Sequence, residues 1–240
     1  MKRDKELICP ICKESNLRFI YRLDDSPAMT NKIYYSLQSA LREEKAGINL
    51  YGCKNCNFVF NADFDSKRAD YCSNYDNSQD SSAYFSKYLA ELARGLIRKY
   101  DLKNKIVAEV GCGKGKFLKL LYDLGVKKIR GFDPSYVDCN PEIDKLVTKK
   151  FFSPKNAGEK TDFIICRHVL EHIPNLNEFI SQISECLTDD GGIYLEFPDL
   201  KWIIKNKVVF DFTYEHCNYF TENSVIALFS KSGFQNILFN

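Results

Sequence analysis

The 240-residue sequence contains one tryptophan, two methionines and three histidines, and its formal net charge is only +2. This near balance gives no global electrostatic reason to bind nucleic acid or an acidic membrane. No apolar run approaches the roughly 20 residues that a membrane span needs. The amino-terminal stretch MKRDKELICPIC passes from charged residues directly into a cysteine pair, without the apolar core of a secretion signal. We therefore expect a cytoplasmic protein with no membrane span.

Cysteine, in contrast, is abundant, with ten copies. In a reducing compartment we expect thiols or metal ligands rather than disulfides. Two C-x-x-C pairs, Cys9–Cys12 and Cys53–Cys56, form the ligand set expected of a four-thiolate zinc site. The roughly 40 residues between the pairs exceed the common spacing of about 15–20, and residues 31–47 are predicted to fill the gap with a helix. The predicted zinc is structural because four thiolates leave no open coordination position. Redox dithiols or a disulfide are the alternatives.

The pattern along the chain predicts three parts. Residues 1–60 form the zinc-binding module, residues 61–82 a linker or active-site lid, and residues 83–240 a cofactor-binding domain. Apolar residues at helical spacing predict a helix over residues 84–100. From residue 105 onward, five short apolar stretches alternate with helical ones. This alternation predicts an α/β fold with a doubly wound, Rossmann-like parallel sheet.

A glycine-rich loop follows the first strand of that predicted sheet. Glu109 ends the strand, and the loop has the spacing G-x-G-x-G over residues 111–115. Glycines let a cofactor approach main-chain amides at the start of a helix. About 20 residues further on, Asp133 ends the second strand, where an acid can accept hydrogen bonds from ribose hydroxyls. The combination predicts an adenosine site, and the absence of a G-x-x-x-x-G-K-[ST] motif argues against a phosphate-binding loop.

Four stretches in succession, EVGCGKGKF, GFDPS, DFIICRHVLEHI and GGIYLEFPD, resemble the motifs of class I S-adenosylmethionine-dependent methyltransferases. With the paired C-x-x-C module in front, the chain is similar to the zinc-containing sugar methyltransferases, which include deoxysugar C-methyltransferases. The resemblance implies methylation, at carbon or oxygen, of a sugar, nucleotide sugar or surface-polysaccharide precursor. It implies S-adenosylmethionine as cofactor, held by Glu109, Gly111, Gly113, Gly115, Asp133, Arg167 and His168.

Residues 167–174, RHVLEHIP, contain H-x-x-E-H, the spacing at which inverzincin peptidases hold zinc. Here the motif follows the apolar run 163–166, so we expect it at the carboxyl end of a parallel strand, where ligands bind. Pro174 interrupts any helix almost at once, which argues against a peptidase. In the resembled family this motif lines the cofactor pocket. A purely structural role, in which Glu171 and His172 only cap and pack the turn, remains open.

Residues 211–220, DFTYEHCNYF, are dense in groups that can move protons. A histidine oriented by a neighbouring group suits the role of general base, so we expect His216, with Glu215, to act on the acceptor. The resembled C-methyltransferases carry Tyr-His-Glu-His here, and this chain has Thr213-Tyr214 in the first two positions. A tyrosine from the predicted lid, Tyr75 or Tyr71, is the expected replacement. The alternative is an aromatic lid in which His216 is merely hydrogen-bonded.

The last stretches predict a helix over residues 222–234 and the start of a strand over residues 235–240. The further C-terminal domain of the sugar enzymes has no counterpart in this sequence, which leaves open a shorter family member or a piece of a longer chain. Two other functions remain open: an RNA base methyltransferase with a zinc module, and a non-catalytic scaffold that binds zinc and adenosine. The acceptor and the oligomeric state are not determined by the sequence.

Overall fold

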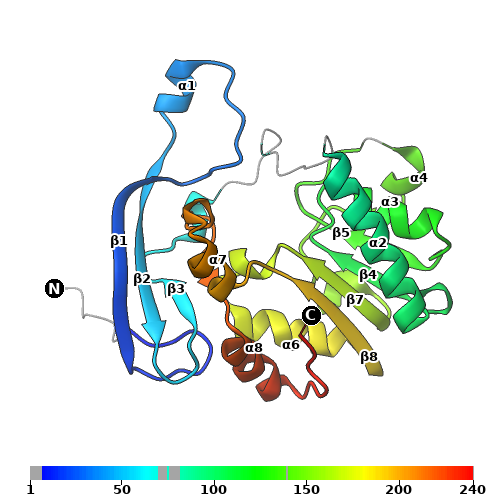
Figure 1. Ribbon diagram of the computed structural model, residues 1–240. Helices are drawn as coiled ribbons and strands as arrows, with labels where there is room; N and C mark the ends of the chain where they lie inside the picture. Colours follow the sequence, from blue (N-terminus) through cyan, green and yellow to red (C-terminus); the bar gives the residue numbers. More distant parts are fainter. Residues whose placement is uncertain (1–6, 70–74, 76–81, 139, 240) are drawn as a thin grey trace. The chain divides into compact units, whose positions relative to one another are not determined.

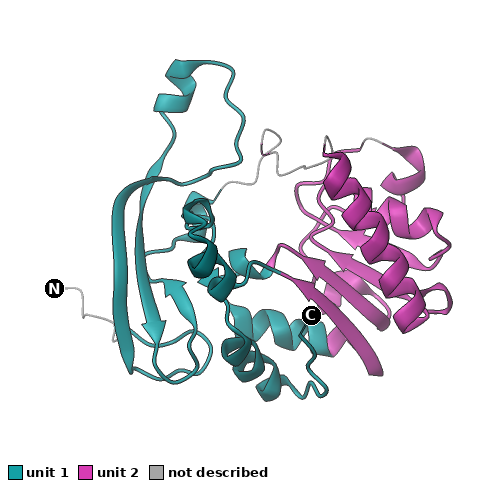
Figure 2. Cartoon of the chain, viewed as in Figure 1, with its two compact units in different colours: residues 1–70, 170–184, 197–240 teal, residues 71–169, 185–196 magenta. Residues whose placement is uncertain are grey.

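The computed structural model describes residues 7–69, 75, 82–138 and 140–239. The chain forms two compact units that are interleaved in sequence. Unit 1 comprises residues 1–70, 170–184 and 197–240, and unit 2 comprises residues 71–169 and 185–196 (Figure 2). The domain boundaries at residues 60 and 82 stay a prediction, since compactness in space and autonomy in folding are different properties.

Unit 2 is built on a five-stranded sheet with the strand order β6-β5-β4-β7-β8 (Figure 1). All four neighbouring pairs are parallel. The strands are β4 (Val107–Val110), β5 (Ile129–Phe132), β6 (Val147–Thr148), β7 (Thr161–Arg167) and β8 (Leu187–Glu196). The predicted α/β fold with its parallel sheet is confirmed. The strand order reverses direction between β4 and β7, the point at which open α/β sheets bind their ligands.

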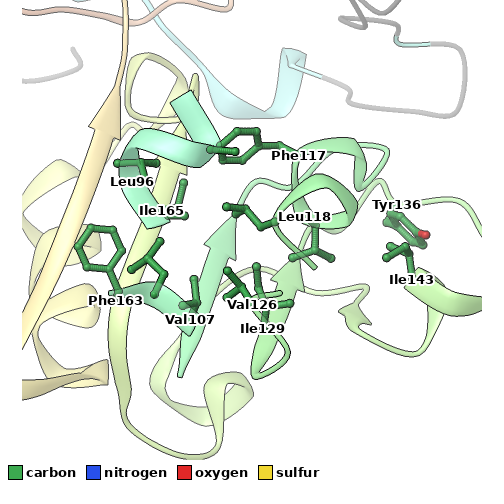
Figure 3. Close-up of a cluster of buried hydrophobic side chains, with 13 residues drawn as sticks. Leu96, Val107, Phe117, Leu118, Val126, Ile129, Tyr136, Ile143, Phe163 and Ile165 are labelled. Atoms are coloured by element: carbon green, nitrogen blue, oxygen red, sulfur yellow. The ribbon is translucent and has the colours of Figure 1, made fainter. Parts of the chain in front are cut away.

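The α-helices of unit 2 are α2 (Ala83–Tyr100), α3 (Lys116–Asp123), α4 (Pro141–Asp144) and α5 (Pro154–Ala157). The apolar residues of α2 and α3 pack against the apolar strands of the sheet. Leu96 of α2 and Leu118 of α3 belong to one buried cluster with Val107 and Ile165 of the sheet (Figure 3). Ser82 caps the first turn of α2 by accepting a hydrogen bond from the amide of Phe85. The helix predicted over residues 84–100 is therefore present and begins one residue earlier.

Unit 1 contains a four-stranded antiparallel sheet with the order β1-β2-β3-β9. Its strands are β1 (Leu17–Pro27), β2 (Lys45–Cys53), β3 (Val59–Asn61) and β9 (Asn218–Tyr219). β9 comes from the far end of the chain and pairs Tyr219 with Val59 and Asn218 with Phe60. The loop that precedes β9, residues 211–217, is thereby anchored to the same sheet as the second cysteine pair.

The helices of unit 1 are short, and α6 continues into unit 2. They are α1 (Leu37–Leu41), α6 (Leu176–Cys186), α7 (Leu200–Asn206) and α8 (Glu222–Phe229). The predicted helix over residues 31–47 was wrong in extent: only α1 is helical, and Lys45 and Ala46 pair with β1 as part of β2. The strand predicted from residue 235 is also absent, because residues 235–239 have no strand partner. In the part of the chain that the structure describes, no helix is long and apolar enough to cross a membrane.

Candidate functional site

The glycine loop connects β4 to α3 through three residues with positive φ: Gly111 at 71°, Gly113 at 53° and Gly115 at 72°. A Cβ on Gly111 would overlap a methyl carbon of Val169, so any side chain there would displace Val169 and would also be strained by the positive φ. A Cβ on Gly113 would meet no described atom within 4 Å. The loop therefore approaches other chain segments closely at Gly111 and faces open space at Gly113, as a main-chain cradle for a cofactor requires.

Asp133, directly after β5, holds this loop in place. Its Oδ2 accepts a hydrogen bond of 2.8 Å from the amide of Gly113. Its Oδ1 accepts from the amide of Ser135 at 2.8 Å and from the Ser135 hydroxyl at 2.6 Å. The carboxylate is thus fixed in orientation at the end of the second strand of the predicted cofactor domain. A ribose hydroxyl would have to share these oxygens with the loop's own donors.

Glu109 lies within β4 and is 3% exposed. Among the described residues, its Oε2 has no hydrogen-bond partner. Burial raises the pKa of Glu109 to about 8, with a further increase from Asp133 and an opposing decrease from the positive charge of Arg167. A carboxyl group in this environment can accept a hydrogen bond from a bound molecule or form an ion pair with its positive charge.

Arg167 and Glu196 end the neighbouring strands β7 and β8 and are paired in register. The Arg167 Nε donates to Glu196 Oε2 at 2.6 Å, and its guanidinium lies 4.6 Å from the ring centroid of Phe117. Glu196 Oε1 lies 3.3 Å from His168 Nε2 and accepts from the Tyr88 hydroxyl at 2.8 Å. Burial opposes ionisation of Glu196, but the hydrogen bonds from His168 and Arg167 and their charges prevail and lower its pKa to about 2.

All seven predicted cofactor residues lie in unit 2, on β4, in its glycine loop or at the carboxyl ends of β5 and β7. The donor and acceptor set fits S-adenosylmethionine: fixed carboxylate oxygens for hydroxyls, a buried carboxyl oxygen without a partner for the ammonium group, and open space at Gly113. Sequence reasoning missed Glu196, which joins Arg167 and His168. Its position at the end of an apolar strand, like that of Asp133, was the available signal.

The two cysteine pairs of unit 1 form turns with the same hydrogen-bond pattern. The amide of Lys13 bonds to the carbonyl of Cys9 at 3.0 Å, and the amide of Asn57 to that of Cys53 at 2.9 Å. Lys13 and Asn57 both have positive φ, 68° and 60°. The amides of Ile11 and Cys12 also hydrogen-bond to the Cys9 sulfur. Each turn therefore directs two sulfurs to one side and supplies amide donors to them, as zinc-binding turns require.

The four sulfurs converge. Sγ of Cys9 lies 3.6 Å from Sγ of Cys56, and Sγ of Cys12 lies 3.4 Å from Sγ of Cys53. All four sulfurs lie within 4.8 Å of one another. A tetrahedral zinc with Zn–S bonds of ~2.3 Å separates its sulfurs by ~3.8 Å, so the cluster fits such an ion with small adjustments. The cluster can hold zinc. Asn177 of α6 fixes the first turn by donating to the carbonyl of Pro10 at 2.7 Å.

A second polar cluster lies in unit 1, where a short 3₁₀ helix (Leu170–His172) meets the loop before β9. The Asn218 side chain donates to the carbonyls of Leu170 and Ile173 at 2.9 and 2.7 Å. This link brings His172 next to His216, with ring centroids 4.9 Å apart. The stretch 212–217 is irregular rather than extended, so neighbouring side chains need not point to opposite faces.

Each histidine of this cluster is oriented by a main-chain carbonyl. His172 Nδ1 lies 2.9 Å from the carbonyl oxygen of Glu215, and His216 Nδ1 lies 3.0 Å from that of Asp211. Burial lowers the pKa of His172, and His216 adds to this decrease, while the carboxylates of Glu171 and Glu215 oppose it. Glu171, His172 and His216 bring their ligand atoms within 4.8 Å of one another. The sequence predicted that the motif containing Glu171 and His172 lines the cofactor pocket and left a packing role open, but it did not predict their grouping with His216.

The buried Glu215 carboxylate is held by a residue far away in the sequence. Its Oε1 accepts from the amide of Thr30 at 3.0 Å and also from the Thr30 hydroxyl. The nearby tyrosines have structural partners: the Tyr214 hydroxyl accepts from the amide of Asp65 at 2.7 Å, and the Tyr219 hydroxyl donates to the carbonyl of Thr213 at 3.2 Å. Burial raises the pKa of both tyrosines, so neither is suited to exchange protons.

The predicted lid is described only in part. Tyr75 is half-buried and belongs to unit 2. Tyr71 lies outside the described residues. The proton-transfer role assigned to Tyr75 therefore stays a prediction.

Comparisons with known proteins point to one family. A model of the methyltransferase domain matches residues 81–238. A tRNA U34 carboxymethyltransferase of Campylobacter hominis is 30% identical over 105 residues, covering 40% of this chain and 37% of that protein. C-methyltransferase NovU of Streptomyces niveus is 27% identical over 136 residues, covering 53% of this chain and 32% of NovU. The match thus spans about a third of the length of these relatives.

Solved structures give similar matches. A SAM-dependent methyltransferase from Archaeoglobus fulgidus has a TM-score of 0.46 and 21% identity, covering 65% of this chain and 76% of that one. Magnesium protoporphyrin IX methyltransferase from Synechocystis PCC 6803, with bound SAM, has a TM-score of 0.46 and 17% identity, covering 67% of this chain and 77% of that one.

Proposed function

Because the chain belongs to the family of methyltransferase domains, we propose that it transfers the methyl group of S-adenosylmethionine to a sugar, nucleotide sugar or surface-polysaccharide precursor. The acceptor's lone pair attacks the methyl carbon in line with the carbon–sulfur bond. That bond breaks with its electron pair remaining on sulfur, and S-adenosylhomocysteine leaves. The protein aligns the two reactants and removes the acceptor's proton.

In this proposal, unit 2 holds the cofactor. The carboxylate of Asp133, held in place by the amide of Gly113, binds the ribose end, and Glu109 receives the ammonium of the methionine part. Arg167 and His168, fixed by Glu196, line the rim. The four-thiolate cluster of unit 1 holds a structural zinc that stabilises the turns around Cys9 and Cys53.

The cluster around His216 binds the acceptor and removes its proton. With its Nδ1 bonded to the carbonyl of Asp211, the neutral ring presents an acceptor nitrogen, Nε2, to the acceptor's proton. Glu215, fixed by Thr30, can bind a hydroxyl of the acceptor. The two tyrosines of this segment are bonded to main chain, which leaves His216 as the proton acceptor of the segment.

The observation that carries the choice of acceptor is the pair of buried carboxylates beside the histidines, Glu171 at 2% and Glu215 at 1% exposure. Carboxylates accept hydrogen bonds from the hydroxyls of a sugar and repel the phosphates of a polynucleotide. NovU is a C-methyltransferase, which agrees with methylation at carbon. The tRNA U34 carboxymethyltransferases favour a second candidate, methylation or carboxymethylation of RNA, although their matches cover only about 40% of this chain.

The test is a transfer assay with S-adenosylmethionine labelled in the methyl group. The acceptors are a panel of nucleotide sugars in one arm and total tRNA in the other. We expect label in a nucleotide sugar. His216→Ala should lower turnover by ~10²–10⁴, the usual contribution of a general base, with unchanged cofactor affinity. His168→Ala, which changes the rim of the proposed cofactor site in unit 2, should instead weaken cofactor binding, and at saturating cofactor it should keep more turnover than His216→Ala. Label that enters tRNA alone would replace the sugar proposal with the RNA one.

A further inference from the structure

The cluster of Glu171, His172 and His216 has a property that base catalysis does not require. Its three ligand atoms come from two segments 44 residues apart in sequence and lie within 4.8 Å of one another. Asn218, through its bonds to Leu170 and Ile173, holds the segments together. The convergence is therefore built into the fold of unit 1 and does not depend on an exposed side chain.

The hydrogen bonds of the two imidazoles fix their tautomers. A carbonyl oxygen only accepts, so Nδ1 of both His172 and His216 carries the hydrogen. In each neutral ring the lone pair is then on Nε2. An imidazole that donates Nδ1–H to a main-chain carbonyl and offers Nε2 is the usual arrangement of a histidine that ligates a metal.

The charge around these rings favours a cation. Glu171, which is 2% exposed, supplies a carboxylate to the cluster, and Glu215, which directly precedes His216 in the sequence, is 1% exposed. Two imidazole nitrogens and one carboxylate oxygen form a ligand set suited to Zn²⁺ and its substitute Co²⁺. Ligand atoms around a tetrahedral zinc are ~3.3 Å apart. Because the ligand atoms lie within 4.8 Å of one another, binding would draw any two of them closer by at most about 1.5 Å.

We propose that Glu171, His172 and His216 form a second metal site, which binds Zn²⁺ through three protein ligands and leaves one position open. It differs in kind from the four-thiolate cluster, where the protein fills every position. Three protein ligands with an open position are the arrangement of catalytic zinc. If the acceptor is a sugar, as in the proposed function, the open position accepts one of its oxygens. Nε2 of His216 is then a ligand of the ion, and His216 acts on the acceptor through the ion instead of taking its proton directly. Binding of the ion itself does not depend on that function.

The experiment measures metal binding without any acceptor. The full chain, with its thiolate site loaded with zinc, is titrated with Co²⁺ alone and followed by absorption. We expect one further equivalent whose spectrum has ligand-field bands without the sulfur-to-cobalt charge transfer of a thiolate site. His172→Ala and His216→Ala should each abolish this equivalent. His168→Ala should retain it, because His168 pairs with Glu196 in unit 2.

Folding of each variant is checked by circular dichroism and by its retained thiolate-site metal. The proposal is overturned if the wild-type chain takes up no further Co²⁺ or Zn²⁺, or if all three histidine variants bind it equally. In either case the three side chains do not form a metal site. The transfer assay then still decides on the proposed function, since a methyltransferase whose His216 acts directly as base needs no ion there.

Discussion

The carboxyl group of Glu109 lies inside β4, where burial raises its pKa to about 8. In the unfolded chain the pKa is the ordinary value of about 4.5, so the folded state binds more protons between these two values. A group whose pKa is raised on folding stabilises the fold only while it is protonated. The free energy of unfolding should therefore fall as the pH rises from about 4.5 to about 8.

Glu109→Gln keeps the shape of this side chain and removes its ionisation. Without cofactor, we expect the variant to be more stable than the wild type at about pH 9 by on the order of 4 kcal/mol, and similar to it near pH 5. Urea unfolding at both pH values measures the difference. Glu142→Gln, an exposed carboxylate of α4, serves as the control and should show no such pH-dependent gain. Equal pH dependence of Glu109→Gln and the wild type would contradict the buried-acid interpretation.

Single residues also show how far sequence reasoning reaches. The positions of Gly111, Gly113 and Asp133, in the turn after β4 and at the end of β5, could be predicted because a glycine turn and an acid at the end of the next strand form a local pattern. The side chains that contact Glu215 and His216 come from distant parts of the sequence. Glu215 is fixed by Thr30, 185 residues away, and His172 meets His216 across 43 intervening residues. No spacing in the chain indicates those contacts, because they depend on how β9 returns to the sheet of unit 1.

At the scale of helices and strands, too, local patterns could be predicted and contacts between distant segments could not. Buried runs such as residues 107–110 and 163–166 predicted their strands, because a parallel strand covered on both faces is continuously apolar. The helix predicted over residues 31–47 was too long partly because residues 45–47 form the start of β2. Ser26 pairs with Ala46, and Pro27 with Lys45, and these antiparallel pairs between distant segments override a local preference.

Loss of the proposed zinc should affect the two cysteine turns most, because the ion would hold them together. A structural zinc contributes its binding free energy to folding. Cys56→Ser should release the thiolate-bound zinc and lower the free energy of unfolding by more than about 4 kcal/mol, since loss of a structural metal ranks among the largest single-site effects. Zinc analysis and urea unfolding measure the two effects.

The matched control is Cys186→Ser, because Cys186 is also a buried thiol and lies outside the cluster. We expect it to keep its zinc and to lose only about 1 kcal/mol. A Cys56→Ser protein with full zinc content and unchanged stability would show that the four sulfurs do not hold a structural ion.

At the scale of the whole molecule, the two units are interleaved in sequence, and this determines whether they unfold together. The chain crosses between them after residues 70, 169, 184 and 196, and the expected cofactor residues all lie in unit 2. The only tryptophan, Trp202, lies on α7 in unit 1 and is 56% exposed. Its fluorescence therefore reports the unfolding of one unit, whereas the proposed cofactor site lies in the other.

S-adenosylhomocysteine at about 100 times its Kd should raise the free energy of unfolding by ~2.7 kcal/mol and the melting temperature by roughly 5–10 °C. Because four crossings join the units, we expect the Trp202 signal to shift as much as the circular dichroism. Asp133→Ala removes an acceptor worth ~1–3 kcal/mol of affinity and should lose most of the shift at the same ligand concentration, whereas His216→Ala should keep it. If only the circular dichroism shifts, the two units unfold independently, and cofactor binding stabilises unit 2 alone.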